Sequence, residues 1–223
     1  VYNVKTVDGK EVLTYLPEIS ITEMEDDELE EINCSTTVDL QLVTGNTYKV
    51  IFWADNENAP YYTHWEDVTN PTVTIDYYNN QNGVTCNNED YDAFFNWMTI
   101  DVDAAKTVEI DLFRPFAQLN IGTSDIVQAS QAGYTLKQTQ VTVKAYQTLN
   151  LWGMTVSDPT NVTFNAADYP NYDANAAYGL KDSNADGYEE FPVPGYEYMA
   201  MNYLLCPEDK ELVDVEFDFF ADN

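Results

Sequence analysis

The sequence predicts an all-β protein made of two antiparallel β-sandwich domains in tandem, with one short helix. Apolar and polar residues alternate with a period of two at short intervals, as antiparallel strands with one dry face require. Aromatic residues make up 14% of the chain, with 17 tyrosines, and they favour strands. Turn-forming Asn, Asp, Gly and Pro separate the alternating runs, which is typical of a sandwich with short connections.

The alternating runs define the expected strands in chain order, at residues 38–42, 48–53, 72–77, 108–112, 116–121, 141–146 and 213–219. In the last run Val215, Phe217 and Phe219 point to one side, whereas Glu216 and Asp218 point to the other. This pattern predicts a half-buried strand with an acidic exposed face. The prolines in residues 191–195 exclude a central strand there, and an inner strand is expected from about residue 196 to residue 205.

One segment predicts a helix, near residues 124–133 with the sequence "SDIVQASQAG". Ser124 or Asp125 can cap the first turn, and Gly133 can adopt the left-handed conformation that ends a helix. The domain boundary is expected near residues 112–115, where the second series of alternating runs begins. Pro115 cannot donate a backbone hydrogen bond to a ladder there. The predicted domains are residues 1–112 and residues 113–223, the second of which could be truncated.

The charge balance excludes several partners. The chain has 39 acidic and 9 basic residues and a formal net charge of −30, so it repels nucleic acid and anionic membrane surfaces. High solubility is the simpler reason for this charge. No apolar stretch is long enough to span a membrane and no signal peptide is recognisable, so direct membrane insertion is not expected. The abrupt, strand-like ends indicate a processed or trimmed chain.

No set of residues predicts an enzyme. Cys34, Cys86 and Cys206 have no metal-binding or redox spacing, and they are expected to be buried thiols with at most one disulfide among them. His64 stands beside acidic residues but has no nucleophile or metal partner in the sequence. Carboxylate pairs such as Asp90 and Asp92 are expected in so acidic a chain and do not indicate a glycosidase.

Two segments could bind a ligand. Asp182, Asn184 and Asp186, followed by Gly187, match the opening of a calcium loop, and Glu190 could act through a water molecule. The bidentate glutamate expected at position twelve is replaced by Val193, so a polar hairpin turn is the alternative. No cofactor is required, and calcium is the one metal considered.

A second candidate is an aromatic cluster, which could stack on the face of a sugar ring. Its members are Trp53, Tyr61, Tyr62 and Trp65. Aromatic pairs inside a sandwich core are the more common explanation for such a cluster. Binding would need two or three of these rings to be exposed on one face.

Several segments, in this order along the chain, resemble the fimbrillin-like surface proteins of Bacteroidetes, the superfamily of type V pilus subunits. They are "TYKVIFWAD" (47–55), "EDYDAFF" (89–95), "LFRPFAQLNIGTSDIVQASQAGYTL" (112–136), "VTVKAYQTLNL" (141–151) and "MNYLLCP" (201–207). The segment around Arg114 is the most specific of them. The resemblance covers roughly residues 48–207.

The resemblance implies two transthyretin-like β-sandwich domains and export as a lipoprotein precursor to the outer membrane. It also implies removal of an N-terminal strand by a protease and polymerisation by strand exchange between pilin subunits. Arg114, the single arginine, would be a structural anchor between sheets. Pro115 would make the bond after Arg114 a poor substrate for arginine-specific proteases.

The expected function is therefore a non-enzymatic structural or adhesive subunit of a fimbria at the cell surface. Its partners would be other pilin subunits, together with a host or bacterial surface glycan or protein. The alternative is a surface carbohydrate-binding protein, assisted by calcium at Asp182, Asn184, Asp186 and Glu190.

Overall fold

The structure is a computed structural model of the chain, and it describes residues 1–20, 35–55, 61–64, 67–77, 84–85, 91–167, 196–205 and 213–222. These residues form an all-β fold, as predicted, with mostly antiparallel strands and a single short α-helix in the described ranges. The alternation of apolar and polar residues therefore predicted the fold class correctly.

The first sheet has four antiparallel strands in the order β2-β1-β3-β7. Their bounds are Tyr2–Val7 for β1, Lys10–Tyr15 for β2, Thr47–Asp55 for β3 and Ala93–Asp101 for β7. Asp8 and Gly9 form the turn between β1 and β2, and both have a positive φ, of 52° and 76°. Such a turn matches the twist of the two strands it joins.

The second sheet has eight strands arranged around β9. Their bounds are Tyr62–Thr63 for β4, Thr72–Ile75 for β5, Val84–Thr85 for β6, Phe116–Thr123 for β8, Thr135–Asn150 for β9, Thr155–Ala167 for β10, Glu197–Leu205 for β11 and Val215–Asp222 for β12. One edge of β9 pairs with β10, while β12, Leu205 of β11 and β5 follow one another along its other edge. The short β6 is parallel to β10.

The two halves of the chain share one sheet and one core. Residues 72–74 of β5 pair with residues 148–150 of β9, so the strands cross the boundary predicted between residues 112 and 113. The same buried cluster contains Val73 and Phe95 from the first half and Val141 and Phe164 from the second. The two halves share a sheet because β9 is long. Its 16 residues reach from one end of this sheet to the strands of the first half.

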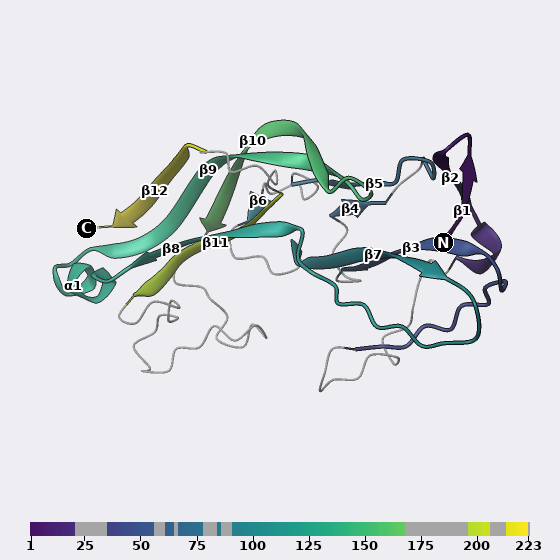
Figure 1. Cartoon of the computed structure of the whole chain (residues 1–223). Coiled ribbons are helices and arrows are strands. Elements are labelled where there is room, and N and C mark those ends of the chain that lie inside the picture. Colours follow the sequence, from purple (N-terminus) through teal and green to yellow (C-terminus); the bar gives the residue numbers. More distant parts are fainter. Residues whose placement is uncertain are drawn as a thin grey trace.

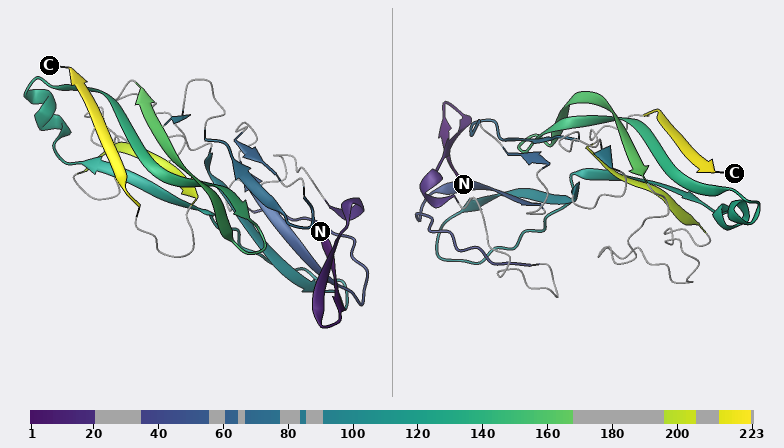
Figure 2. Two further views of the ribbon diagram at one scale, coloured as in Figure 1. Left: turned by 90° about the horizontal axis from the view of Figure 1, so that it is seen from above. Right: turned by 180° about the vertical axis from the view of Figure 1, so that it is seen from behind.

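The strands lie in two layers (Figure 1), with β9, β10 and β12 in one layer and β3, β7, β8 and β11 in the other. The molecule is elongated (Figure 2). The β1–β2 hairpin and the N-terminus lie at one end, whereas β12, α1 and the C-terminus lie at the other. The two ends of the described chain therefore present different surfaces.

Two of the expected strands are absent. Residues 38–42 and 108–112 have no regular secondary structure and form no ladder with a described strand. Beside the second segment, Phe113 forms an isolated bridge with Phe95 of β7 that does not extend into a ladder. The expected inner strand near residue 196 is confirmed as β11, in which every residue from Met199 to Leu205 is buried. Alternation is thus enough to predict a strand only where the chain also supplies a neighbour.

The predicted helix is confirmed as α1, Ile126–Gln131. Gly133 has a φ of 94°, and the amide of Tyr134 donates to the carbonyl of Ala129 at 3.0 Å, which ends the helix as expected. The predicted hydrogen bond from the helix amides to the side chain of the N-cap residue is absent. Asp125 occupies the N-cap position but its side chain does not cap the helix, because its carboxylate accepts a hydrogen bond from the hydroxyl of Thr123.

Candidate functional site

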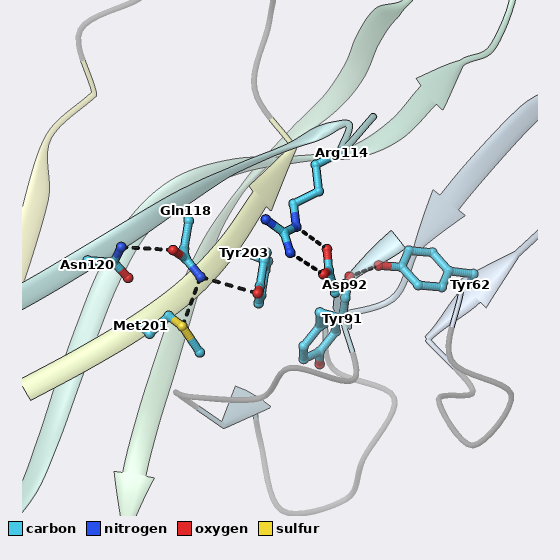
Figure 3. A network of polar contacts seen from close by, with 8 residues as sticks. All are labelled: Tyr62, Tyr91, Asp92, Arg114, Gln118, Asn120, Met201 and Tyr203. Atoms are coloured by element: carbon cyan, nitrogen blue, oxygen red, sulfur yellow. Dashed lines mark hydrogen bonds and ion pairs between the residues drawn. The ribbon is translucent and has the colours of Figure 1, made fainter. Parts of the chain in front are cut away.

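The single arginine joins the two sheets through Asp92, as the anchor role implies. The Nε of Arg114 donates to Oδ1 of Asp92 at 2.6 Å, and its Nη2 donates to Oδ2 at 2.7 Å (Figure 3). The guanidinium also lies over the rings of Phe94 and Tyr203, at 5.1 and 6.0 Å from their centroids. Arg114 precedes β8, Asp92 precedes β7 and Tyr203 belongs to β11, so one side chain fixes three strands together.

A polar network continues from this anchor along β8 and β11 (Figure 3). The Nε2 of Gln118 donates to the hydroxyl of Tyr203 at 3.2 Å, and the Nδ2 of Asn120 donates to the side-chain oxygen of Gln118 at 2.9 Å. These side chains lie on one face of the β8–β11 ladder. On the opposite face Asn202 is only 2% exposed, and neither polar atom of its amide has a hydrogen-bond partner. The network fixes the ladder and offers no reactive group.

The described rings of the predicted aromatic cluster pack against the core and its aromatic residues rather than forming an exposed platform. Trp53 lies edge-on to Tyr62, with ring centroids 5.4 Å apart, and Tyr61 stacks on Tyr91 at 4.0 Å. The hydroxyl of Tyr62 donates to the carbonyl of Tyr91 (Figure 3), and burial raises the pKa of Tyr62. Trp65 lies outside the described residues. The arrangement agrees better with core packing than with a sugar-binding surface.

His64 contacts the carboxylate of Asp55. Its Nε2 lies 3.2 Å from Oδ2 of Asp55, and the indole nitrogen of Trp53 donates to the same oxygen at 2.8 Å. Burial of Asp55 opposes its ionisation, but the hydrogen bonds from His64 and Trp53 outweigh it and lower the pKa of Asp55. This grouping holds a charged carboxylate in place and contains no catalytic nucleophile.

The other candidate residues lie outside the described part of the chain. They are Cys34, Cys86 and Cys206, and the calcium-loop residues Asp182, Asn184, Asp186 and Glu190. Among the residues that are described, no three His, Cys, Asp or Glu side chains are close enough together to hold a metal ion. The calcium hypothesis remains a prediction.

The strand β12 is more exposed than the sequence predicted. Its register places Val215, Phe217 and Phe219 on the same face as the buried residues of β9. A buried face was therefore expected, yet Phe219 is 62% exposed and Val215 is 41% exposed. Only Phe217 packs against the core. The apolar face of β12 is uncovered because no described strand of the facing layer covers it.

Several strands in the described ranges pair with a neighbour on one side only, and β12, β8 and β2 are among them. β12 pairs only with β9, β8 only with β11, and β2 only with β1. Each of these edges presents backbone N–H and C=O groups that another strand could pair with. Within the described residues, no helix is long and apolar enough to cross a membrane.

The sequence reasoning missed the β1–β2 hairpin and the cluster beneath it. Trp152, in the turn after β9, packs edge-on against Tyr2 at 5.1 Å and Trp97 at 5.7 Å. Lys49 lies over the rings of Trp97 and Trp152 and forms an ion pair with Glu11 at 2.6 Å. The Asp8–Gly9 pair between two alternating runs was the signal for this hairpin.

Two layers of mostly antiparallel strands with open edges define an all-β protein of the sandwich type. Residues 7–223 match the model of a family of unknown function (DUF6562), and the chain belongs to that family. No curated protein and no solved structure matches the chain. The function must therefore be argued from the residues themselves.

Proposed function

We propose that this protein is a non-enzymatic structural or adhesive subunit of a fimbria on the bacterial cell surface. Copies of it assemble when a strand of one subunit adds to an open sheet edge of another. The uncovered apolar face of β12 carries this proposal, because Phe219 and Val215 lie in register with buried residues of β9 and yet contact solvent. The resemblance to fimbrillin-like proteins supports the same function.

The energetics favour such an assembly. Full burial of a large apolar side chain contributes about 1.5–3 kcal/mol, and Phe219 has more than half of its surface left to bury. Backbone hydrogen bonds along the added strand fix its position, and alternate side chains fix its register. The net charge of −30 keeps unassembled copies apart until specific contacts form.

The test compares assembly of the full-length precursor, before and after treatment with a surface protease, by size-exclusion chromatography and electron microscopy. We expect polymers after cleavage, and we expect Phe219→Asp to abolish them. The matched control is Val43→Asp, because Val43 is 64% exposed in a segment without strand pairing. A precursor that stays monomeric at every concentration contradicts the proposal.

The alternative, a carbohydrate-binding surface protein, makes a different prediction. The monomer would bind members of a glycan array, with affinity that falls on removal of calcium if the loop at Asp182, Asn184 and Asp186 takes part. The packing of Trp53, Tyr61 and Tyr62 against the core leaves this alternative less well supported. Glycan binding by a monomer that never polymerises would favour it.

A further inference from the structure

The hairpin at one end of the molecule carries an unusual surface for so acidic a chain. Lys5 lies opposite Val12, and Val7 lies opposite Lys10, so these four side chains share one face of the hairpin. Val7 is 52% exposed, Val12 is 44% exposed, and both lysines are exposed. The hairpin also projects beyond its sheet, because β1 pairs with β3 only through residues 2–4.

The two lysines of the hairpin differ from three other described cations, which are held by carboxylates. Lys49 pairs with Glu11, Lys106 with Asp103 and Arg114 with Asp92. In the part of the chain that the structure describes, Lys5 and Lys10 form no ion pair. In sequence, the nearest acidic residue to Lys5 is Asp8 in the turn, and the nearest to Lys10 is Glu11, which is already paired with Lys49.

The opposite end of the molecule carries the complementary surface. On β12, Glu216 and Asp218 are exposed on the face away from the core, and Val215 and Phe219 are exposed on the core-side face. β12 and β2 both have an open edge in the described residues. Figures 1 and 2 show these strands at opposite ends of the elongated molecule, so one chain cannot join them to each other.

We infer that the open edge of β2 in one copy pairs with the open edge of β12 in the next copy, with the lysine face of the hairpin against the acidic face of β12. This inference rests on the proposed function and names the two surfaces that meet in the assembly. The partner is a second copy of this chain, joined head to tail. A repeated contact of this type generates a filament instead of a closed dimer.

The side-chain alternation of the two strands fits this pairing on both faces. When Lys10 and Val12 lie on the side of Glu216 and Asp218, Leu13 and Tyr15 fall on the side of Val215, Phe217 and Phe219. A slip of one residue would place Leu13 beside the acidic groups and Lys10 beside the phenylalanines. Charge and apolar burial therefore select the same set of registers.

The test uses charge reversal in full-length chains matured by the protease. Lys10→Glu puts two acidic groups together at the contact, and Asp218→Lys puts two lysines together. We expect each variant alone to assemble about tenfold more weakly than the wild type, because attraction between partly exposed charges becomes repulsion. Lys106→Glu, which changes the net charge as much as Lys10→Glu does, is the matched control and should assemble normally.

Mixing the two variants gives the decisive result. In a filament where they alternate, the glutamate introduced at position 10 meets the lysine introduced at position 218, and the native Lys10 meets the native Asp218. Opposite charges then meet at every contact, and we expect assembly to recover to near the wild-type level. Thermal unfolding of each variant checks that the fold is intact.

Three results would count against the inference, and they separate its failure from that of the proposed function. Assembly of Lys10→Glu that is as strong as that of the wild type, or no recovery on mixing, overturns the inference and leaves the proposed function standing. A wild-type precursor that never assembles overturns both.

Discussion

The ion pair between Arg114 and Asp92 provides the most direct quantitative prediction. Its two hydrogen bonds are 2.6 and 2.7 Å long, and the Asp92 side chain is 17% exposed while that of Arg114 is 48% exposed. A hydrogen bond to a charged group contributes about 1.5–3 kcal/mol when buried, whereas exposed ion pairs contribute about 0.2–1 kcal/mol. The half-exposed geometry places the coupling energy of this pair at about 1 kcal/mol.

Arg114→Ala also removes the guanidinium from the rings of Phe94 and Tyr203, which adds about 0.5–1 kcal/mol. We therefore expect a total loss of about 2 kcal/mol, equivalent to a decrease in Tm of about 4–8 °C for a chain of this length. Arg114→Lys keeps the charge but loses the paired geometry, and it should lose about half as much.

The assay is a double-mutant cycle with Arg114→Ala, Asp92→Ala and the double variant, followed by chemical denaturation. If the pair is coupled as the geometry indicates, the double variant is more stable than the sum of the single losses predicts, by about 1 kcal/mol. Losses that add to within about 0.3 kcal/mol would show that the two residues stabilise the fold independently, which would refute the role of Arg114 as a link between the two sheets.

Three further predictions concern other parts of the fold. Phe164→Ala removes a ring that is 1% exposed and should lower the free energy of unfolding by about 3–5 kcal/mol, measured by denaturant titration. Asn202→Leu replaces a buried amide that has no hydrogen-bond partner and should raise the free energy of unfolding by about 1 kcal/mol or more; a loss would contradict this reasoning. Trp53→Phe removes a donor to Asp55 and should raise the pKa of Asp55 towards its ordinary value, as measured by NMR titration. Because the pKa of Asp55 is lowered in the folded chain, its contribution to stability is present above its unfolded pKa and is lost as the pH falls through the folded pKa, so this loss at acid pH should be smaller in Trp53→Phe.

Local patterns in the sequence predicted local structure well. Alternation predicted strands β3, β5, β8, β9 and β12, and Gly133 predicted the end of α1. The failures involve partners that are distant in sequence. Residues 38–42 and 108–112 alternate like strands but form no ladder with a described strand, and the predicted division at residue 112 did not anticipate that β5 would pair with β9.

The candidate site shows the same limit. The sequence indicated Arg114 as an anchor, but its partner Asp92 lies 22 residues earlier and is one of many carboxylates in the chain. The alternation of β12 was predicted correctly, whereas its exposure was not, because burial depends on what the facing layer covers. The lysine face of the hairpin depends on the register that the Asp8–Gly9 turn sets, which the sequence analysis did not use.

The length of β9 has a mechanical consequence. β9 pairs with β12 from residue 135 to residue 143 and with β5 from residue 148 to residue 150, so a single strand connects both ends of its sheet. Ladder hydrogen bonds run perpendicular to the strands. Tension that pulls β12 along its own direction would load all the hydrogen bonds between β12 and β9 at once, in shear. These bonds could not break one after another. Such a joint resists force far better than its equilibrium stability alone suggests.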